Sequence, residues 1–168
     1  MLVCQTDRLT IRHFGDQDAP FILTLLNDKS FIDNIADKGL KTIDDALNYL
    51  RAGPMASYEK FGFGLNLVCL RDSDIPIGMC GLVSRDELEH SDLGYALLPE
   101  YWRQGYAYEA SLAVLKDGQD SYNLAVVAAI TSPHNKASNG LLKKLGFSFV
   151  DLIELSGDTN NLCEYYSA

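Results

Sequence analysis

The stretch LGYALLPEYWRQGYAYEA, residues 93–110, decides how the rest of the chain is arranged. Its first residues predict the end of a strand, Pro99 interrupts the regular structure, and a helix is predicted over about residues 105–118. Gly105 and Ala107 leave the first amides of that helix open to a close approach. Such amides, with the positive end of the helix dipole, bind anions such as a pyrophosphate. A glycine near a helix start is also a common capping or packing choice, so the pattern alone leaves both interpretations open.

Strand and helix patterns alternate on both sides of this stretch. Hydrophobic periodicity predicts strands at residues 9–14, 64–71, 76–83, 91–97, 124–130, 147–155 and 162–167. Near the start of the chain, Pro20 opens one helix, and Thr42 opens a second with Asp45 three residues later as a capping box. Asn135 is suited to cap a last helix. Residues 91–130 therefore form a strand–helix–strand unit with an expected right-handed crossover, and the predicted fold class is mixed α+β.

Length and composition favour one compact domain. The 168 residues are 47% hydrophobic, which provides a sizeable core for a domain spanning residues 1–168, and no repeat or linker divides them. The longest apolar run, residues 124–130, is far shorter than the roughly 20 residues that cross a bilayer. The first ten residues carry charge where a signal peptide is apolar. We therefore expect a cytoplasmic protein without a membrane partner.

The charge balance argues against a nucleic-acid partner, and the cysteine spacing argues against disulfides and a metal site. A net charge of −9 opposes nucleic-acid binding, and it suits a cationic substrate or serves solubility alone. The cysteines are scattered without a C-x-x-C pair or a neighbouring histidine, so we expect neither a disulfide framework nor a metal site. The dinucleotide and P-loop signatures are both missing. A phosphate-binding helix start in this chain therefore requires another family.

Four motifs resemble such a family. Residues 102–107, WRQGYA, are similar to the Q/R-x-x-G-x-G/A signature of the GNAT (Gcn5-related N-acetyltransferase) superfamily, with Trp102 at its first place. Residues 94–110 resemble the branch of ribosomal-protein N-terminal (alanine/serine) acetyltransferases, with Arg103 and Gln104 where that branch usually has Gly-Lys. Residues 5–12, 76–82 and 135–147 resemble the family's opening strand, third strand and closing Asn-x-x-Ser motif. The resemblance thus covers nearly the whole chain in the family's order.

The resemblance implies a fold and an activity. The GNAT fold is a twisted, mixed and mostly antiparallel sheet of six to seven strands, with helices on both faces and a splayed parallel pair that admits the pantetheine arm. The implied activity is N-acetylation, in which a primary amine attacks acetyl-CoA directly without an acyl-enzyme intermediate. The cosubstrate is acetyl-CoA, and no metal is implied.

The resemblance also assigns residues to roles. Cofactor binding falls to the backbone of Leu97 and Leu98 along pantetheine, to the backbone amides of Arg103, Gln104, Gly105, Tyr106, Ala107 and Tyr108 at the pyrophosphate, and to Asn135. Ser138 is the candidate that protonates the departing sulfur, although Asn135 and Ser138 also suit a helix cap and first turn. Tyr101, Tyr165 and Tyr166 are alternative proton donors.

The general base and the acceptor stay open. Asp92 shares a strand face with Gly94 and is the candidate base, directly or through water, although such a carboxylate is often a solvated edge group. His13 and His134 are further titratable candidates. The acceptor is a protein N-terminal α-amine or a small amine such as a polyamine or aminoglycoside. The alternatives are another acyl donor, such as succinyl-CoA, and a catalytically degenerate acyl-CoA sensor or protein-interaction module. A homodimer also stays open.

Overall fold

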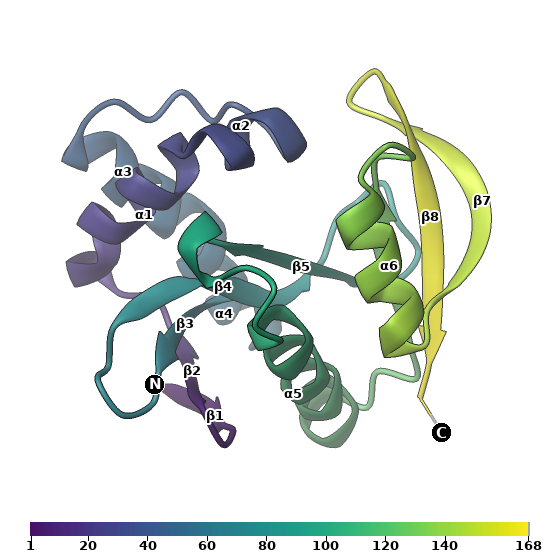
Figure 1. The fold of residues 1–168 in the computed structure, drawn as a ribbon, viewed down its shortest axis with the longest axis horizontal. Coiled ribbons are helices and arrows are strands. Elements are labelled where there is room, and N and C mark those ends of the chain that lie inside the picture. The colour runs from purple at the N-terminus through teal and green to yellow at the C-terminus, as the bar shows by residue number, and fades with distance from the viewer. Residues whose placement is uncertain (168) are drawn as a thin grey trace.

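A sheet of eight strands in the order β1-β2-β3-β4-β5-β6-β8-β7 runs through the protein, and the computed structural model describes residues 1–167 (Figure 1). The strands are β1 (Leu2–Gln5), β2 (Leu9–His13), β3 (Leu65–Leu70), β4 (Pro76–Val83), β5 (Asp92–Leu97), β6 (Val126–Thr131), β7 (Ser148–Leu155) and β8 (Asp158–Tyr166). Neighbouring strands are antiparallel except β5 and β6, which are parallel. The mixed, mostly antiparallel sheet with one parallel pair is confirmed.

The strand count is a correction, because the sheet has eight strands where six to seven were expected. The additional strand is β1, which forms a hairpin with β2. Its four residues are too few to show a period, and none of them is fully buried. The strand is therefore stabilised by its pairing with β2, a long-range fact that local sequence patterns do not contain.

Two groups of helices cover the two faces of the sheet (Figure 1). The helices are α1 (Ala19–Asn27), α2 (Lys29–Asn34), α3 (Ile43–Leu50), α4 (Ala56–Phe61), α5 (Tyr106–Tyr122) and α6 (Lys136–Leu145), with short turns at Asp16–Asp18, Arg51–Met55 and Pro99–Tyr101. Helices α1 to α3 pack on one face, and α5 and α6 pack on the other. The predicted capping box at α3 is confirmed, since the Asp45 amide donates to Thr42 Oγ1 at 3.1 Å. Helices α2 and α4 were not predicted.

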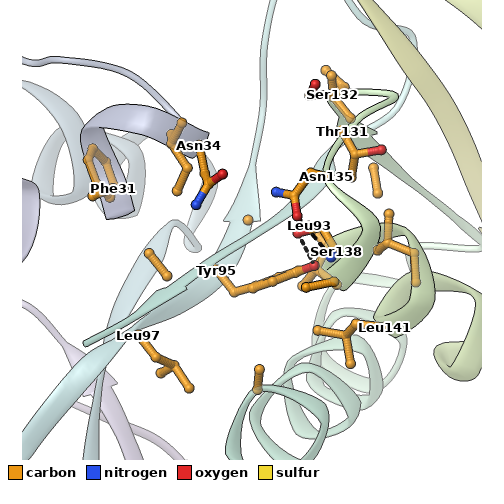
Figure 2. A pocket seen from close by; sticks show the side chains of 18 of the residues that line it. Phe31, Asn34, Leu93, Tyr95, Leu97, Thr131, Ser132, Asn135, Ser138 and Leu141 are labelled. Carbon is orange, nitrogen blue, oxygen red and sulfur yellow. Dashed lines mark hydrogen bonds between the residues drawn. The ribbon is translucent and has the colours of Figure 1, made fainter. Parts of the chain in front are cut away.

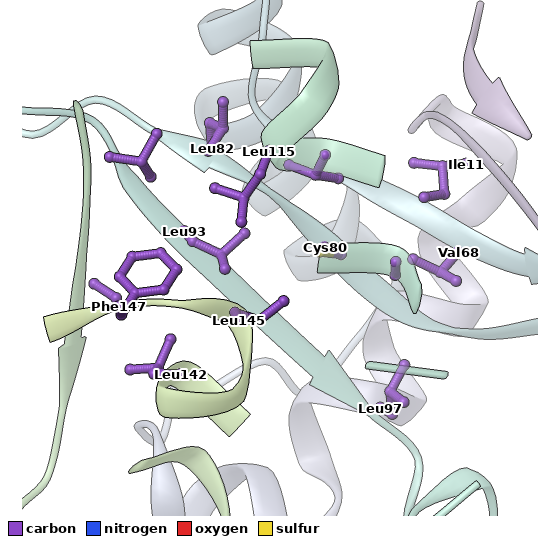
Figure 3. Packing of buried hydrophobic residues seen from close by; sticks show 14 of the residues in the cluster. Ile11, Val68, Cys80, Leu82, Leu93, Leu97, Leu115, Leu142, Leu145 and Phe147 are labelled. Carbon is purple, nitrogen blue, oxygen red and sulfur yellow. The ribbon is translucent and has the colours of Figure 1, made fainter. Parts of the chain in front are cut away.

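Strand β5 is packed on both faces because its side chains alternate between them. Leu93 and Leu97 join a cluster with Leu115 of α5 and Leu142 of α6, as Figure 3 shows. Ala96 belongs to the second cluster, which α1, α2 and α3 form on the other face. This two-sided burial fixes β5 as a rigid central element between the two helical layers.

The parallel pair β5–β6 is splayed. The two strands share a single register pair, Asp92 with Ala128, and the Ala128 amide donates to the Ser91 carbonyl at 2.8 Å. Beyond this point β6 continues only against β8, so the edge of β5 from Leu93 to Leu97 faces an opening. At the far edge of the sheet, β7 is exposed along most of its length. No helix within residues 1–167 combines the length and apolarity that a bilayer span requires.

Candidate active site

A cleft of about 1370 Å³ occupies the opening between β5 and β6. Its walls are β5, the start of α5, the β6–α6 connection, α2 and the β7–β8 turn. Figure 2 shows Asn34 of α2 on one side of the cleft, with Asn135 and Ser138 of the α6 start on the other. The two walls lie on opposite sides of the opening between β5 and β6, so the cleft results from the separation of these two strands.

The start of α5 presents free amides to this cleft. The first hydrogen bond of the helix runs from the Glu109 amide to the Gly105 carbonyl at 3.0 Å. Within residues 1–167, the amides of residues 103–108 donate to no backbone carbonyl or side chain, as expected for the first turn of a helix and the loop before it. Arg103 and Gly105 both have left-handed backbones, with φ of 60° and 83°, which turn the loop into the helix. The arrangement is suited to hold an anion.

Arg8, at the turn before β2, braces this helix start. Its Nε donates to Glu109 Oε1 at 2.8 Å, and its Nη1 donates to the Gln104 carbonyl at 2.9 Å. Its guanidinium also lies over the Tyr106 ring, 4.3 Å from the centroid. Thr6 adds a hydroxyl hydrogen bond to the second oxygen of Glu109. The sequence analysis gave Arg8 no role, because its partners lie about a hundred residues away.

The two leucines predicted along pantetheine differ in their surroundings. The Leu98 amide donates to the Ile77 carbonyl of β4 at 2.9 Å, and Leu98 does not line the cleft. Because backbone groups alternate along a strand, the Leu97 amide points away from β4 and towards the opening. The Leu97 carbonyl accepts a hydrogen bond from Trp102 Nε1 at 2.9 Å. The structure therefore brings Leu97 to the cleft and leaves Leu98 engaged within the sheet.

Ser138 lies in a small hydrogen-bonded group on the α6 side of the cleft. The Ser138 amide donates to Asn135 Oδ1 at 3.2 Å, which confirms Asn135 as the cap of α6. Tyr95 of β5 donates its hydroxyl to Ser138 Oγ at 2.8 Å, as the dashed lines in Figure 2 show. Burial raises the pKa of Tyr95, so its hydroxyl stays protonated. Tyr95 was missed by the sequence analysis, although strand alternation places it on the same face as Leu93 and Leu97.

Asp92 is buried and ion-paired. The residue is 2% exposed, and Arg85 Nε donates to its Oδ1 at 2.8 Å. Burial raises the pKa of Asp92 above its usual value, while the nearby Arg85 guanidinium opposes that shift. Asp92 lines the cleft, so the interpretation as a solvated edge group does not describe it. By alternation it shares a face with Gly94, opposite to the face that carries Tyr95.

The remaining candidates lie in different places. Tyr101 and His134 line the cleft. Tyr165 packs on Phe147 with ring centroids 5.5 Å apart, and Tyr166 donates to Glu164, both outside the cleft. His13 stacks on Tyr58 at 3.6 Å, away from the cleft, and burial lowers its pKa. Across residues 1–167, no group of three or more His, Cys, Asp or Glu side chains is placed to hold a metal ion.

A helix start with free amides beside the open edge of a splayed parallel pair agrees with the fold that the resemblance to the GNAT acyltransferases implies. Comparison with known proteins agrees. The family model described as "Acetyltransferase (GNAT) domain" matches residues 8–148. The chain therefore belongs to the GNAT family of acetyltransferases and is a transferase.

Individual relatives match most of the chain. The "Uncharacterized N-acetyltransferase YoaA" of Bacillus subtilis (strain 168) is 29% identical over 146 residues, covering 86% of this chain and 82% of YoaA. A crystal structure of an acetyltransferase from Agrobacterium tumefaciens str. C58 superimposes with a TM-score of 0.84 at 21% identity, covering 98% of this chain and 94% of that one. RimL, described as a ribosomal L7/L12 alpha-N-protein acetyltransferase in complex with coenzyme A, gives a TM-score of 0.83 at 13% identity, covering 99% and 98%. These structural likenesses establish the shared fold.

Proposed function

We propose that this protein is an acetyl-CoA-dependent N-acetyltransferase that transfers the acetyl group directly to a primary amine. The observation that carries the proposal is the row of free amides at residues 103–108, placed beside the open edge of β5. A pyrophosphate at these amides and a pantetheine arm along the Leu97 edge would bring the thioester into the cleft between β5 and β6. Asn135 lines the same cleft and uses its side-chain oxygen in the cap. Its side-chain nitrogen donates to no group within residues 1–167 and can serve such a ligand.

The proposed chemistry uses groups on both faces of β5. A C–N bond forms between the amine and the acetyl carbon, and the C–S bond breaks. The amine proton leaves to Asp92, directly or through a water molecule, and Ser138 gives a proton to the departing sulfur. Because Asp92 and Tyr95 lie on opposite faces of β5, the amine is expected to enter from the α1–α3 face and the thiol to depart on the α6 face.

For the acceptor, we propose a protein N-terminal α-amine, with small amines as the alternative. The branch motif at residues 94–110 and the described activity of RimL support an N-terminal amine. The buried Asp92 is a suitable base for an amine that arrives protonated, because a raised pKa brings the carboxylate closer to neutral pH. This argument applies equally to polyamines and aminoglycosides, so activity measurements must choose between them.

The direct test is acetyl-CoA binding by calorimetry. Gly105→Glu adds a side chain and a negative charge at the helix start, and it should abolish micromolar-range binding. Gly39→Glu is the matched control, since Gly39 also has a positive φ, of 67°, and has no atom within 4 Å of an added Cβ. The control should bind like wild type. Wild type that binds acetyl-CoA and acetylates N-terminal peptides supports the proposal, whereas binding without turnover on any amine identifies a degenerate acyl-CoA sensor.

A further inference from the structure

We propose that Tyr95 is a positioning residue for Ser138: its hydroxyl holds the serine oxygen so that the serine proton is free for the departing sulfur. The inference rests on the proposed acetyl transfer. Its basis is the hydrogen bond from Tyr95 to Ser138 Oγ across the cleft wall, 2.8 Å long, between residues 43 positions apart in the chain.

The hydroxyl of Ser138 is located by two elements. On its own helix, the cap bond to Asn135 Oδ1 fixes the backbone of Ser138 in the first turn of α6. From β5, the Tyr95 hydroxyl occupies one acceptor position of Ser138 Oγ. Within residues 1–167, the Ser138 O–H has no acceptor of its own, and both side chains line the cleft. A serine that already accepts one hydrogen bond directs its proton elsewhere, and here the remaining direction includes the cleft.

Packing holds the Tyr95 ring in place, whereas the Ser138 hydroxyl without this hydrogen bond could rotate. The tyrosine packs against the large cluster that contains Leu93, Leu97 and Leu142, on the α5–α6 face. An isolated serine hydroxyl rotates among staggered positions, and ordering it costs free energy at the moment of reaction. A hydroxyl held in advance avoids that cost, which is the usual advantage of a preorganised site.

The proton transfer balances without another reagent. As the C–S bond breaks, the Ser138 O–H bond breaks and an S–H bond forms on the thiol. The negative charge left on Ser138 Oγ is stabilised by the hydrogen bond from Tyr95. Ser138 then regains a proton from solvent, and Asp92 releases the proton that it took from the amine to solvent, which restores both groups.

The test is a double-mutant cycle in the full chain. Tyr95→Phe removes only the hydroxyl, and Tyr122→Phe is the matched control because Tyr122 donates an equally long bond, 2.8 Å, to the Gly62 carbonyl outside the cleft. We expect Tyr95→Phe to lower kcat about 10- to 100-fold with KM for acetyl-CoA within about twofold. Ser138→Ala should lower kcat at least as much, and the double variant should be no slower than Ser138→Ala. Tyr122→Phe should keep wild-type kcat.

Each other outcome overturns the proposal. If Tyr95→Phe matches Tyr122→Phe, the hydroxyl has no part in turnover. If the two losses multiply, Tyr95 acts independently of Ser138, and if Ser138→Ala is active while Tyr95→Phe is not, Tyr95 itself is the donor. Thermal unfolding of each variant shows whether the fold is intact. A wild type without turnover on any amine overturns the acetyltransferase proposal together with this one, whereas an active wild type with an unaffected Tyr95→Phe overturns only this one.

Discussion

At the scale of single residues, Asp92 is under two opposing influences. Burial raises its pKa, and the Arg85 guanidinium lowers it, with burial the larger effect. A carboxyl group whose pKa is higher in the folded state than in the unfolded state binds its proton more tightly when folded. Its contribution to stability is therefore full below the unfolded pKa and declines as the pH rises through the folded pKa. Arg85 limits that decline by stabilising the charged form.

Removing Arg85 should therefore cost most stability at neutral pH. We expect Arg85→Met to lower the free energy of unfolding by about 1–2 kcal/mol at pH 7, a value reduced because the guanidinium is partly solvent-exposed. The loss should shrink near pH 4, because the raised pKa lets Asp92 bind a proton as the pH falls and a neutral Asp92 no longer pairs with Arg85. Urea unfolding at both pH values checks this. Arg51→Met, which breaks an exposed pair with Asp16, is the control and should show a smaller loss that changes less with pH, because the lowered pKa of Asp16 keeps that carboxylate charged to lower pH.

Asp92 also sets an expectation for activity. If Asp92 is the base, Asp92→Asn should lower kcat by about 10²- to 10⁴-fold while acetyl-CoA affinity stays near wild type. Because its pKa is raised, the acidic limb of the kcat/KM profile should lie at a higher pH than an ordinary aspartate would give, and it should vanish in the variant. Steady-state kinetics between pH 4 and 9 measure both. A variant with wild-type kcat would remove Asp92 from the mechanism and favour a water relay to another group.

At the scale of elements, helix α5 depends on a segment at the other end of the chain. The hydrogen bonds from Arg8 and Thr6 join the turn before β2 to Glu109, in the first turn of α5. A further bond, from Arg8 to the Gln104 carbonyl, ties the loop before α5 to the same turn. The opening motif of the chain thus supports the predicted pyrophosphate site without touching the thioester.

Removing the hydrogen bonds of Arg8 should weaken acetyl-CoA binding without slowing the acetyl-transfer step. We expect Arg8→Met to raise the Kd for acetyl-CoA about three- to tenfold, roughly 1 kcal/mol, because the loop must be ordered on binding. The value of kcat at saturating acetyl-CoA should stay within about twofold. Calorimetry and kinetics on Arg8→Met, with Arg51→Met as a control, test this. An unchanged Kd would mean that the loop is rigid without Arg8.

At the scale of the whole molecule, the cleft exists because β5 and β6 are paired at one position only, whereas the other neighbouring strands pair at several. Strands β1 to β5 form one continuous ladder and β6 to β8 another, and the single register pair between Asp92 and Ala128 joins them. A ligand in the opening contacts both ladders and would stabilise their relative position. Binding energy that favours the folded state alone appears as added stability.

Acetyl-CoA at about 100 times its Kd should therefore stabilise the protein by about 2.7 kcal/mol, with a higher Tm. In hydrogen exchange, the added protection should concentrate in residues 103–108 and in β5, whose amides at the open edge gain partners. Helix α4, none of whose residues lines the cleft, is the internal reference. Equal protection throughout the chain, or none at residues 103–108, would contradict the assigned site.

Local patterns in the sequence predicted much of the fold. The two-sided apolar pattern of residues 124–130 corresponds to β6, and the predicted caps at Thr42 and Asn135 are present. These features depend on neighbours within one turn or one strand, so local chemistry is sufficient to specify them. The edge strand β1 was missed because it is stabilised by its pairing with β2. The helices α2 and α4 were missed because six residues are too few to show a helical period.

The sequence by itself determined the family, the order of the longer elements and the segment with free amides, because these follow from residue types at fixed short spacings. Only the tertiary structure decided which side chains meet: Tyr95 with Ser138, Arg85 with Asp92, and Arg8 with Glu109. It also separated Leu97, at the open edge, from Leu98, engaged with β4. These contacts depend on strand register, on the splay of β5 from β6 and on the faces chosen by helices, and such long-range geometry arises only when the whole chain packs.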